Sequence, residues 1–245
     1  MISYVIRNGA LLNDPMKGCA GMGKVDMRTS RIHPMEALYE RLASLFGRRG
    51  VTSYLAYELG VYYYALLSWG KRSFERDHAK SYTAHKESGW LTMVLFIIKL
   101  LILEGILVHF FVAKWSSVFA WIMSICNVYM MIWLISDYRA MKLNPIGVSA
   151  QGVWIRLGNQ LRTSLLFEQI ESVEVVNNVE LSGEEENNSF IPIGLSTNVH
   201  IRLKEATRVG IMLGANRTVT DIYLTLDEPR AFVEECRTRL ESTQL

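Results

Sequence analysis

Two long apolar runs dominate the first half of the chain. Residues 91–113 and 117–136 are each about 20 mostly apolar residues, enough for a helix to cross a hydrocarbon core of roughly 30 Å. Only Lys114, Trp115 and Ser116 separate the two runs. The pattern therefore predicts an antiparallel hairpin of transmembrane helices, with Lys114 and Trp115 near the lipid headgroups.

A third apolar and aromatic run, residues 51–69, contains one charged residue, Glu58. It is predicted to be a further span, which gives two or three transmembrane helices within residues 51–142. Residues 1–50 are expected to be poorly ordered apart from a short helix near 34–47. They lack an apolar core followed by a small-residue cleavage site, so membrane targeting is expected to depend on the internal apolar runs.

The distribution of basic residues predicts the orientation. The connection before the hairpin carries Lys71, Arg72, Arg76, Lys80 and Lys86, whereas the hairpin turn has only Lys114. The positive-inside rule then places residues 70–90, and everything after residue 142, in the cytoplasm. A span at 51–69 conflicts with this rule, because Arg41, Arg48 and Arg49 would crowd its outer end. Either this run lies in the membrane interface, or an earlier span present in relatives is missing.

From Pro145 onward the apolar residues alternate with a period of two. Short segments of this kind, bounded by Gly, Asn and Asp, are typical of strands and turns. They are GVWIRLG, LRTSLLF, ESVEVVN, NVHIRLK, RVGIML and DIYLTLD. An acidic loop (182–189) interrupts them, and a terminal amphipathic helix carries an apolar stripe of Phe232, Val233, Cys236 and Leu240. Residues 143–245 are predicted to form an antiparallel split barrel or sandwich of about seven strands, capped by that helix.

The segments FEQIESVEVV and DIYLTLDEPRAFVEECRTRL resemble the pleckstrin-homology-like domains of many bacterial membrane proteins. The wider pattern ELGVYYYALLSW, HKESG, LEGILVHFF and SDYRAMKLNP is similar to an uncharacterised family of bacterial integral membrane proteins, over about residues 51–240. The resemblance implies a multi-pass protein of the bacterial cytoplasmic membrane with a cytosolic α+β, mainly β, domain. It implies almost no chemistry.

Composition excludes several classes of function. A net charge of +2 is too small for a nucleic-acid-binding surface. Cys19, Cys126 and Cys236 are too far apart for a zinc or redox motif, and His78 and His85 are better explained by a solvated basic loop than by a metal site. The segment GCAGMGKV (18–25) has the spacing of a phosphate-binding loop but lacks the following Ser or Thr and a preceding strand. We therefore expect no catalytic residues, no metal and no cofactor.

The hairpin also contains ionisable residues: Lys99, Glu104 and His109. Successive members are about 140° apart around a helix, so they cannot share one face. The next run offers partners in a small and polar stripe of Ser117, Ala120, Ser124 and Asn127. We expect Asn127 or Ser124 to hydrogen-bond Glu104, because a charge at the bilayer centre costs about 3 kcal/mol. The alternative partner is Glu58 on the first run.

These residues permit two functional hypotheses. The favoured one is a non-enzymatic, membrane-anchored interaction module that binds a membrane or cytosolic protein, with a homo-oligomer left open. The alternative is a small proton-coupled transporter or intramembrane enzyme that uses Glu104, His109 and Glu58. Anionic lipids are expected to contact a set of basic residues: Lys71, Arg72, Arg139, Lys142, Arg156 and Arg162.

Overall fold

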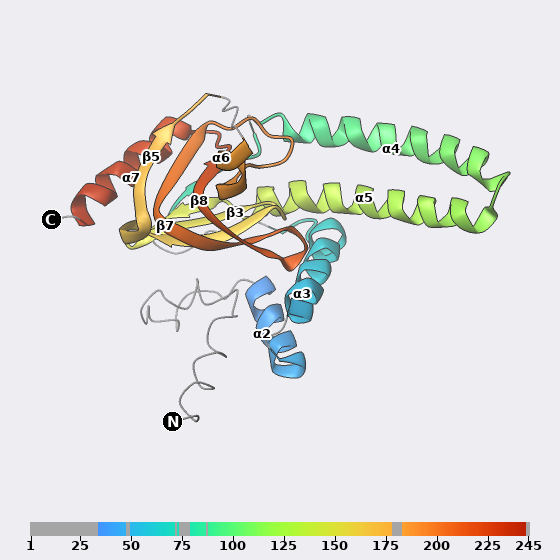
Figure 1. Ribbon diagram of the computed structural model, residues 1–245, viewed down its shortest axis with the longest axis horizontal. Helices are drawn as coiled ribbons and strands as arrows, with labels where there is room; N and C mark the ends of the chain where they lie inside the picture. The colour runs from blue at the N-terminus through green and yellow to red at the C-terminus, as the bar shows by residue number, and fades with distance from the viewer. Residues whose placement is uncertain are drawn as a thin grey trace.

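The structure is a computed structural model that describes residues 34–47, 50–71, 73, 79–86, 88–177 and 183–243. Two antiparallel helices, α4 (Trp90–Ala113) and α5 (Ser117–Leu143), project together from a β-rich body (Figure 1). They contain 24 and 27 residues, and both are long and apolar enough to cross a membrane. They coincide with the two apolar runs from which the sequence predicted a hairpin.

The outer surface of this hairpin is apolar. Leu103 on α4 is 58 % exposed and Ile125 on α5 is 65 % exposed, whereas the small residue Ala120 is fully buried between the helices. A soluble protein places its large apolar side chains inside. The reverse arrangement here is the one expected of helices that face lipid and approach each other through small residues.

Eight strands of the described residues form one sheet. They are β1 (Lys80–Tyr82), β2 (Ile146–Val148), β3 (Gly152–Leu157), β4 (Leu161–Leu166), β5 (Ile170–Val175), β6 (Ser189–Phe190), β7 (Val199–Ile211) and β8 (Asn216–Leu224). The order is β1-β2-β3-β4-β7-β8-β6, and β5 also pairs with β7. All pairs are antiparallel except β6 with β8, which is parallel.

The sheet differs from the predicted antiparallel split barrel. It is mixed, because β6 runs parallel to β8, and it does not close on itself. Two segments predicted as separate strands are one strand, β7, whose pairing with β8 shifts register between Arg202 and Thr207. The predicted acidic loop contains a short helix, α6 (Gly183–Asn188).

The first strand of the sheet precedes the hairpin in the sequence. β1 pairs with β2 through Lys80↔Val148, Ser81↔Gly147 and Tyr82↔Ile146. The sequence assigned residues 70–90 to a basic connection and began the β domain at residue 143, so it missed this strand. The hairpin is consequently an insertion between two neighbouring strands of one sheet.

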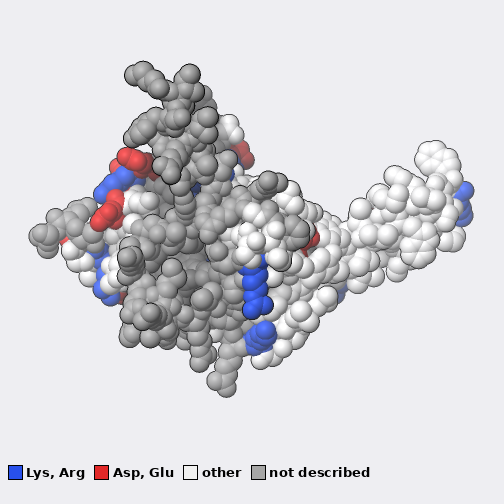
Figure 2. Space-filling model, turned by 90° about the horizontal axis from the view of Figure 1, so that it is seen from below, with Lys and Arg blue, Asp and Glu red and all other residues white. Residues whose placement is uncertain are grey.

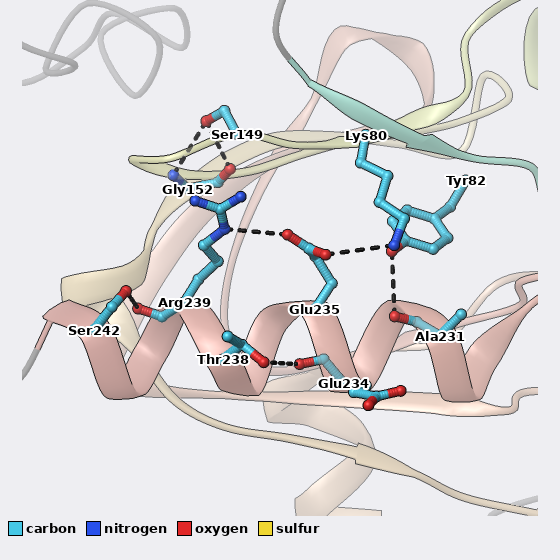
Figure 3. Close-up of polar contacts among 10 residues, drawn as sticks. All are labelled: Lys80, Tyr82, Ser149, Gly152, Ala231, Glu234, Glu235, Thr238, Arg239 and Ser242. Carbon is cyan, nitrogen blue, oxygen red and sulfur yellow. Dashed lines mark hydrogen bonds and ion pairs between the residues drawn. The ribbon is translucent and has the colours of Figure 1, made fainter.

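The C-terminal helix α7 (Pro229–Thr243) contacts β1 (Figure 3). The hydroxyl of Tyr82 donates to the backbone oxygen of Ala231 over 3.2 Å. Glu235 accepts from Lys80 over 3.4 Å and from Arg239 over 3.1 Å. The sequence on both sides of the hairpin is therefore held in one folded unit.

One apolar core joins the sheet, α7 and the base of the hairpin. Phe232, Val233 and Cys236 of the predicted stripe are buried in it, as are Trp90 of α4 and Met141 of α5. Ile155, Ile201 and Leu224 of the sheet are fully buried in the same cluster. The hairpin helices thus begin and end inside the core of the β body.

The third apolar run has a different shape from the first two. It forms α3 (Gly50–Tyr62) and a π-helical turn, η1 (Tyr63–Leu67), next to the base of α5 and below it in Figure 1. Helix α2 (Pro34–Phe46), which lies where the sequence predicted a short helix, packs against α3. The short turns η2 (Phe167–Gln169) and η3 (Met212–Gly214) follow β4 and β7.

Candidate functional site

The ionisable residues of the hairpin do not converge on one site. His109 Nδ1 lies 2.7 Å from Ser124 Oγ, and its ring makes an edge contact with Trp121. Lys99 and Glu104 are both exposed on α4. The face of the hairpin drawn in Figure 2 is largely uncharged, with basic atoms at its free end.

The predicted partner of Glu104 is wrong. Asn127 Nδ2 donates to the backbone oxygen of Leu101 over 3.0 Å, and Ser124 is engaged by His109. Within the described hairpin, Glu104 has no hydrogen bond to either residue. The expected close approach of the two helices is present: a Cβ added to Gly105 would lie 3.0 Å from Asn127 Nδ2. The polar stripe therefore packs the helices but leaves Glu104 outside.

Glu58 has its partner on α5. The hydroxyl of Tyr129 donates to Glu58 Oε1 over 2.9 Å and lies 3.1 Å from Oε2. Next to it, Trp133 Nε1 donates to the hydroxyl of Tyr57 over 2.7 Å. These two bonds join α3 to the middle of α5.

A buried carboxylate connects the hairpin to the sheet. Asp137, near the end of α5, is fully buried. Its Oδ1 accepts from the backbone N–H of Asn159 over 2.8 Å. Its Oδ2 accepts from Trp90 Nε1 over 3.0 Å and from Gln160 Nε2 over 3.2 Å. One side chain thus joins the first residue of α4, the end of α5 and the β3–β4 turn, and we call this set the junction.

The β3–β4 turn is shaped to reach Asp137. Gly158 has a positive φ of 55°, and a Cβ at this position would collide with the carboxylate of Asp137. Asn159 Nδ2 also donates to Ser136 Oγ over 2.8 Å, and Gln160 Oε1 accepts from the backbone N–H of Ile193 over 2.7 Å. Glycine is therefore required here, because it allows both the backbone conformation and the close approach.

Two of the predicted lipid-binding residues are occupied by protein contacts. The guanidinium of Arg139 is buried, donates to the backbone oxygen and hydroxyl of Ser68, and stacks 4.9 Å from the Trp69 ring centroid. Lys71 Nζ donates to the hydroxyl of Tyr63 over 2.8 Å. Arg139 thus lies inside the protein, where the sequence placed it at the lipid surface.

The remaining predicted basic residues occupy different places. Lys142 is exposed, and Arg72 lies outside the described residues. Arg156 and Arg162 face each other across β3 and β4 and line a cleft of about 50 Å³. Its walls come from α3 and from the β3–β4 and β7–β8 turns. The Arg156 guanidinium also lies 5.2 Å from the ring centroid of Tyr64.

The potential nucleophile and metal ligands of the described residues are dispersed. Burial raises the pKa of Cys236 to about 12, so its thiol stays protonated. Burial lowers the pKa of His85, whose ring packs against Tyr138. Among the described residues, no group of three His, Cys, Asp or Glu side chains is placed to hold a metal ion. His78, Cys19 and the segment 18–25 lie outside the described residues.

One surface cluster on β7 and β8 is internally bonded. Asp221 accepts from His200 over 2.8 Å and from Arg202 over 3.3 Å, and His200 stacks on Tyr223. Burial alone would raise the pKa of Asp221, but hydrogen bonds from Thr220, His200 and Arg202 hold it below its ordinary value. The carboxylate is thus stabilised in its charged form.

Comparison with protein-family models, curated proteins and solved structures found no match for this chain. The resemblance to pleckstrin-homology-like domains remains a prediction. The candidate site is accordingly defined by the structure alone, and it is the junction around Asp137. Sequence reasoning missed it, although an Asp directly after an apolar run was a usable signal.

Replacing Asp137 by Asn is expected to destabilise the whole protein. The side chain keeps its size, but its amide nitrogen faces two donors, Trp90 Nε1 and Gln160 Nε2, or the Asn159 N–H if the amide is flipped. Leaving buried donors without acceptors should cost about 2–4 kcal/mol of unfolding free energy, measured by denaturant unfolding in detergent micelles. Lys142→Ala, an exposed change on the same helix, should cost less than about 0.5 kcal/mol. Equal stability of Asp137→Asn and the unmodified protein would refute the role of the junction.

Double-mutant cycles should separate the real contacts of the hairpin from the predicted one. His109→Leu and Ser124→Ala remove the same hydrogen bond, so their effects on unfolding free energy should be non-additive by about 0.6 kcal/mol or more. Glu104→Leu and Asn127→Leu share no bond and should be additive. Coupling of the second pair without coupling of the first would contradict this arrangement.

Proposed function

We propose that this protein is a non-enzymatic, membrane-anchored interaction module. The α4–α5 hairpin anchors it in the bacterial cytoplasmic membrane, and the β body is held on the cytosolic side, where it binds a membrane or cytosolic protein. The basic connection before the hairpin supports this orientation. The protein is then a multi-pass membrane protein whose soluble part has a fixed position at the bilayer surface.

The observation that carries the proposal is the insertion of the hairpin into the sheet. Short segments, residues 83–89 and 144–145, connect its two ends to β1 and β2, which pair with each other. Asp137 binds both helices to the β3–β4 turn. A domain that only needed tethering could use a flexible linker. A fixed connection supports a role in which the height and orientation of the β body matter, as in presenting a binding surface to a partner.

The geometry gives no support to the alternative of a proton-coupled transporter. Such a path needs ionisable groups that exchange protons over hydrogen-bond distances. His109 is paired with Ser124, Glu58 is paired with Tyr129, and Glu104 is exposed elsewhere on the hairpin. The three groups therefore do not exchange protons with one another. For His109 and Glu58, each of which has a hydrogen-bond partner on α5, a role in helix packing is favoured.

Arginine substitutions of exposed apolar residues should test the membrane anchor, because they are expected to lower membrane integration only when they lie on the hairpin. Leu103→Arg and Ile125→Arg should each lower the membrane-integrated fraction, because an Arg near the bilayer centre costs about 3 kcal/mol on insertion scales. The fraction is measured as protein that resists alkaline extraction of membranes. Val175→Arg, on an exposed residue of β5, should leave it unchanged. Unchanged integration and higher solubility of the hairpin variants would instead indicate a water-facing hairpin.

Glu104→Gln should separate the interaction module from the transporter. A photo-reactive amino acid at Val175 reports proteins that contact the β body in native membranes, and one at Leu103 serves as the lipid-facing control. The proposal expects a defined protein adduct from Val175 that is the same in the unmodified protein and in the Glu104→Gln variant, and no change in proton flux into proteoliposomes. Loss of flux in this variant, with no adduct from the β body, would contradict the proposal.

A further inference from the structure

In helix α3 the small residues are buried and the large apolar residues are exposed. This distribution is the reverse of the one found in soluble amphipathic helices. Its buried residues are small or of moderate size: Thr52, Ser53, Ala56, Gly60 and Val61. Its exposed apolar residues, with those of η1, are large: Val51, Tyr54, Leu59, Tyr62, Leu66 and Leu67. A helix in water would bury the large residues and expose the polar ones. This face therefore requires an apolar environment outside the described protein.

Both ends of the α3–η1 segment contact the β body. Near the start of α3, the backbone of Ser53 packs so closely on Gly214 of the β7–β8 turn that a Cβ there would collide with it. At η1, Tyr64 is buried under the Arg156 guanidinium and accepts from Asn144 Nδ2 over 3.3 Å. A helix that crossed a bilayer would carry one of its ends about 30 Å away, to the other leaflet. The two contacts keep both ends on the side of the β body.

The middle of α3 contacts the middle of α5. Glu58 and Tyr57 bond to Tyr129 and Trp133, which lie on the turns of α5 that precede Asp137. These turns belong to the last part of the apolar run 117–136. The exposed face of α3 is thus next to the apolar surface of α5, in the half of the apolar run that lies nearer the β body.

We infer that α3 and η1 form an in-plane membrane-binding segment. Its large apolar face enters the acyl-chain boundary of the leaflet next to the β body, and neither end crosses the bilayer. The occupant of this face is phospholipid, because the face continues the lipid-facing surface of the hairpin. The inference rests on the proposed anchoring of that hairpin, and it adds a second lipid contact that fixes how the β body is rotated about the hairpin.

The flanking residues fit this placement. Arg41 on α2 and Lys71 after η1 are both exposed, and the sequence adds Arg48 and Arg49 before α3. With both ends of α3 on the cytosolic side, the positive-inside rule is satisfied at both. The exposed Trp69 follows η1, and Trp is enriched at the headgroup level of membranes. The conflict that the sequence raised for a third span does not arise.

Labelling of single cysteines with a membrane-impermeant maleimide tests the placement. In a chain with Cys19→Ser and Cys126→Ala, the remaining Cys236 is fully buried. Probes are introduced as Ser44→Cys in α2, Ser73→Cys after η1 and Trp115→Cys in the hairpin turn. In intact cells only Trp115→Cys should react, and Ser44→Cys and Ser73→Cys should react after the membrane is permeabilised.

The outcomes of this labelling separate the inference from the proposed function. If Ser44→Cys reacts from outside while Ser73→Cys does not, α3 crosses the membrane and the inference is wrong, although the hairpin anchor stands. Failure of Ser44→Cys to react after permeabilisation also overturns the inference. If Trp115→Cys and Ser73→Cys both react only after permeabilisation, the hairpin does not cross, and the proposed function fails together with the inference. If Trp115→Cys reacts only after permeabilisation and Ser73→Cys reacts in intact cells, the orientation is inverted, and both fail as well.

A spin label at Leu66, which is 61 % exposed, tests lipid contact directly, with Val175, 43 % exposed on β5, as the matched control. The protein is reconstituted in vesicles of phosphatidylcholine with anionic phosphatidylglycerol. Relaxation of the Leu66 label should be enhanced by oxygen more than by a water-soluble nickel chelate, and the Val175 label should show the opposite preference. A Leu66 label that prefers the nickel chelate would show a water-facing segment and overturn the inference.

Discussion

The pairing of β1 with β2 is the constraint on which the rest of the structure depends. These two short strands are neighbours in the sheet, and the whole α4–α5 hairpin leaves and re-enters the β body between them. Neighbouring strands lie about 4.8 Å apart, whereas packed helices lie about 8–10 Å apart. The distance between the two chain segments must therefore increase between the strand ends and the helices. Residues of the junction fill this region, with Trp90 on one side and Asp137 on the other.

A carboxylate suits this position because its two oxygens can accept several hydrogen bonds in fixed directions. An apolar residue would pack against the same neighbours but would leave the indole of Trp90, the amide of Gln160 and the backbone N–H of Asn159 without acceptors. Buried donors without acceptors are costly, so the carboxylate favours one arrangement of hairpin and sheet over others. The requirement for matched donors and acceptors in such a network selects one geometry, whatever its net contribution to stability.

The sequence predicted the parts of the fold that have long or strongly periodic patterns, such as the hairpin and strands β3, β4 and β5. It missed β1 because three residues carry too little pattern, and the partner strand lies beyond the hairpin. A helical wheel groups the residues of one face, but it does not fix which residue of the neighbouring helix lies opposite. Asn127 could bond Glu104 or the Leu101 carbonyl, and the structure has the carbonyl. The donors to Asp137 come from α4 and the β3–β4 turn, and no periodicity reports them.

The polar side chains of α5 that are bonded to neighbouring helices follow one physical rule, whereas Lys99 and Glu104 of α4 are exposed. In a medium without water, a group is retained when a neighbour within the protein satisfies it, and such bonds add only about 1 kcal/mol each to helix association. Ser124 with His109, Asn127 with the Leu101 carbonyl and Tyr129 with Glu58 are pairs of this kind, spaced along α5. The first two bonds fix the rotation of α5 against α4, and the third fixes it against α3. The rotation of α5 in turn directs Asp137 toward the sheet. Weak contacts inside the hairpin therefore help to fix the orientation of the β body relative to the hairpin.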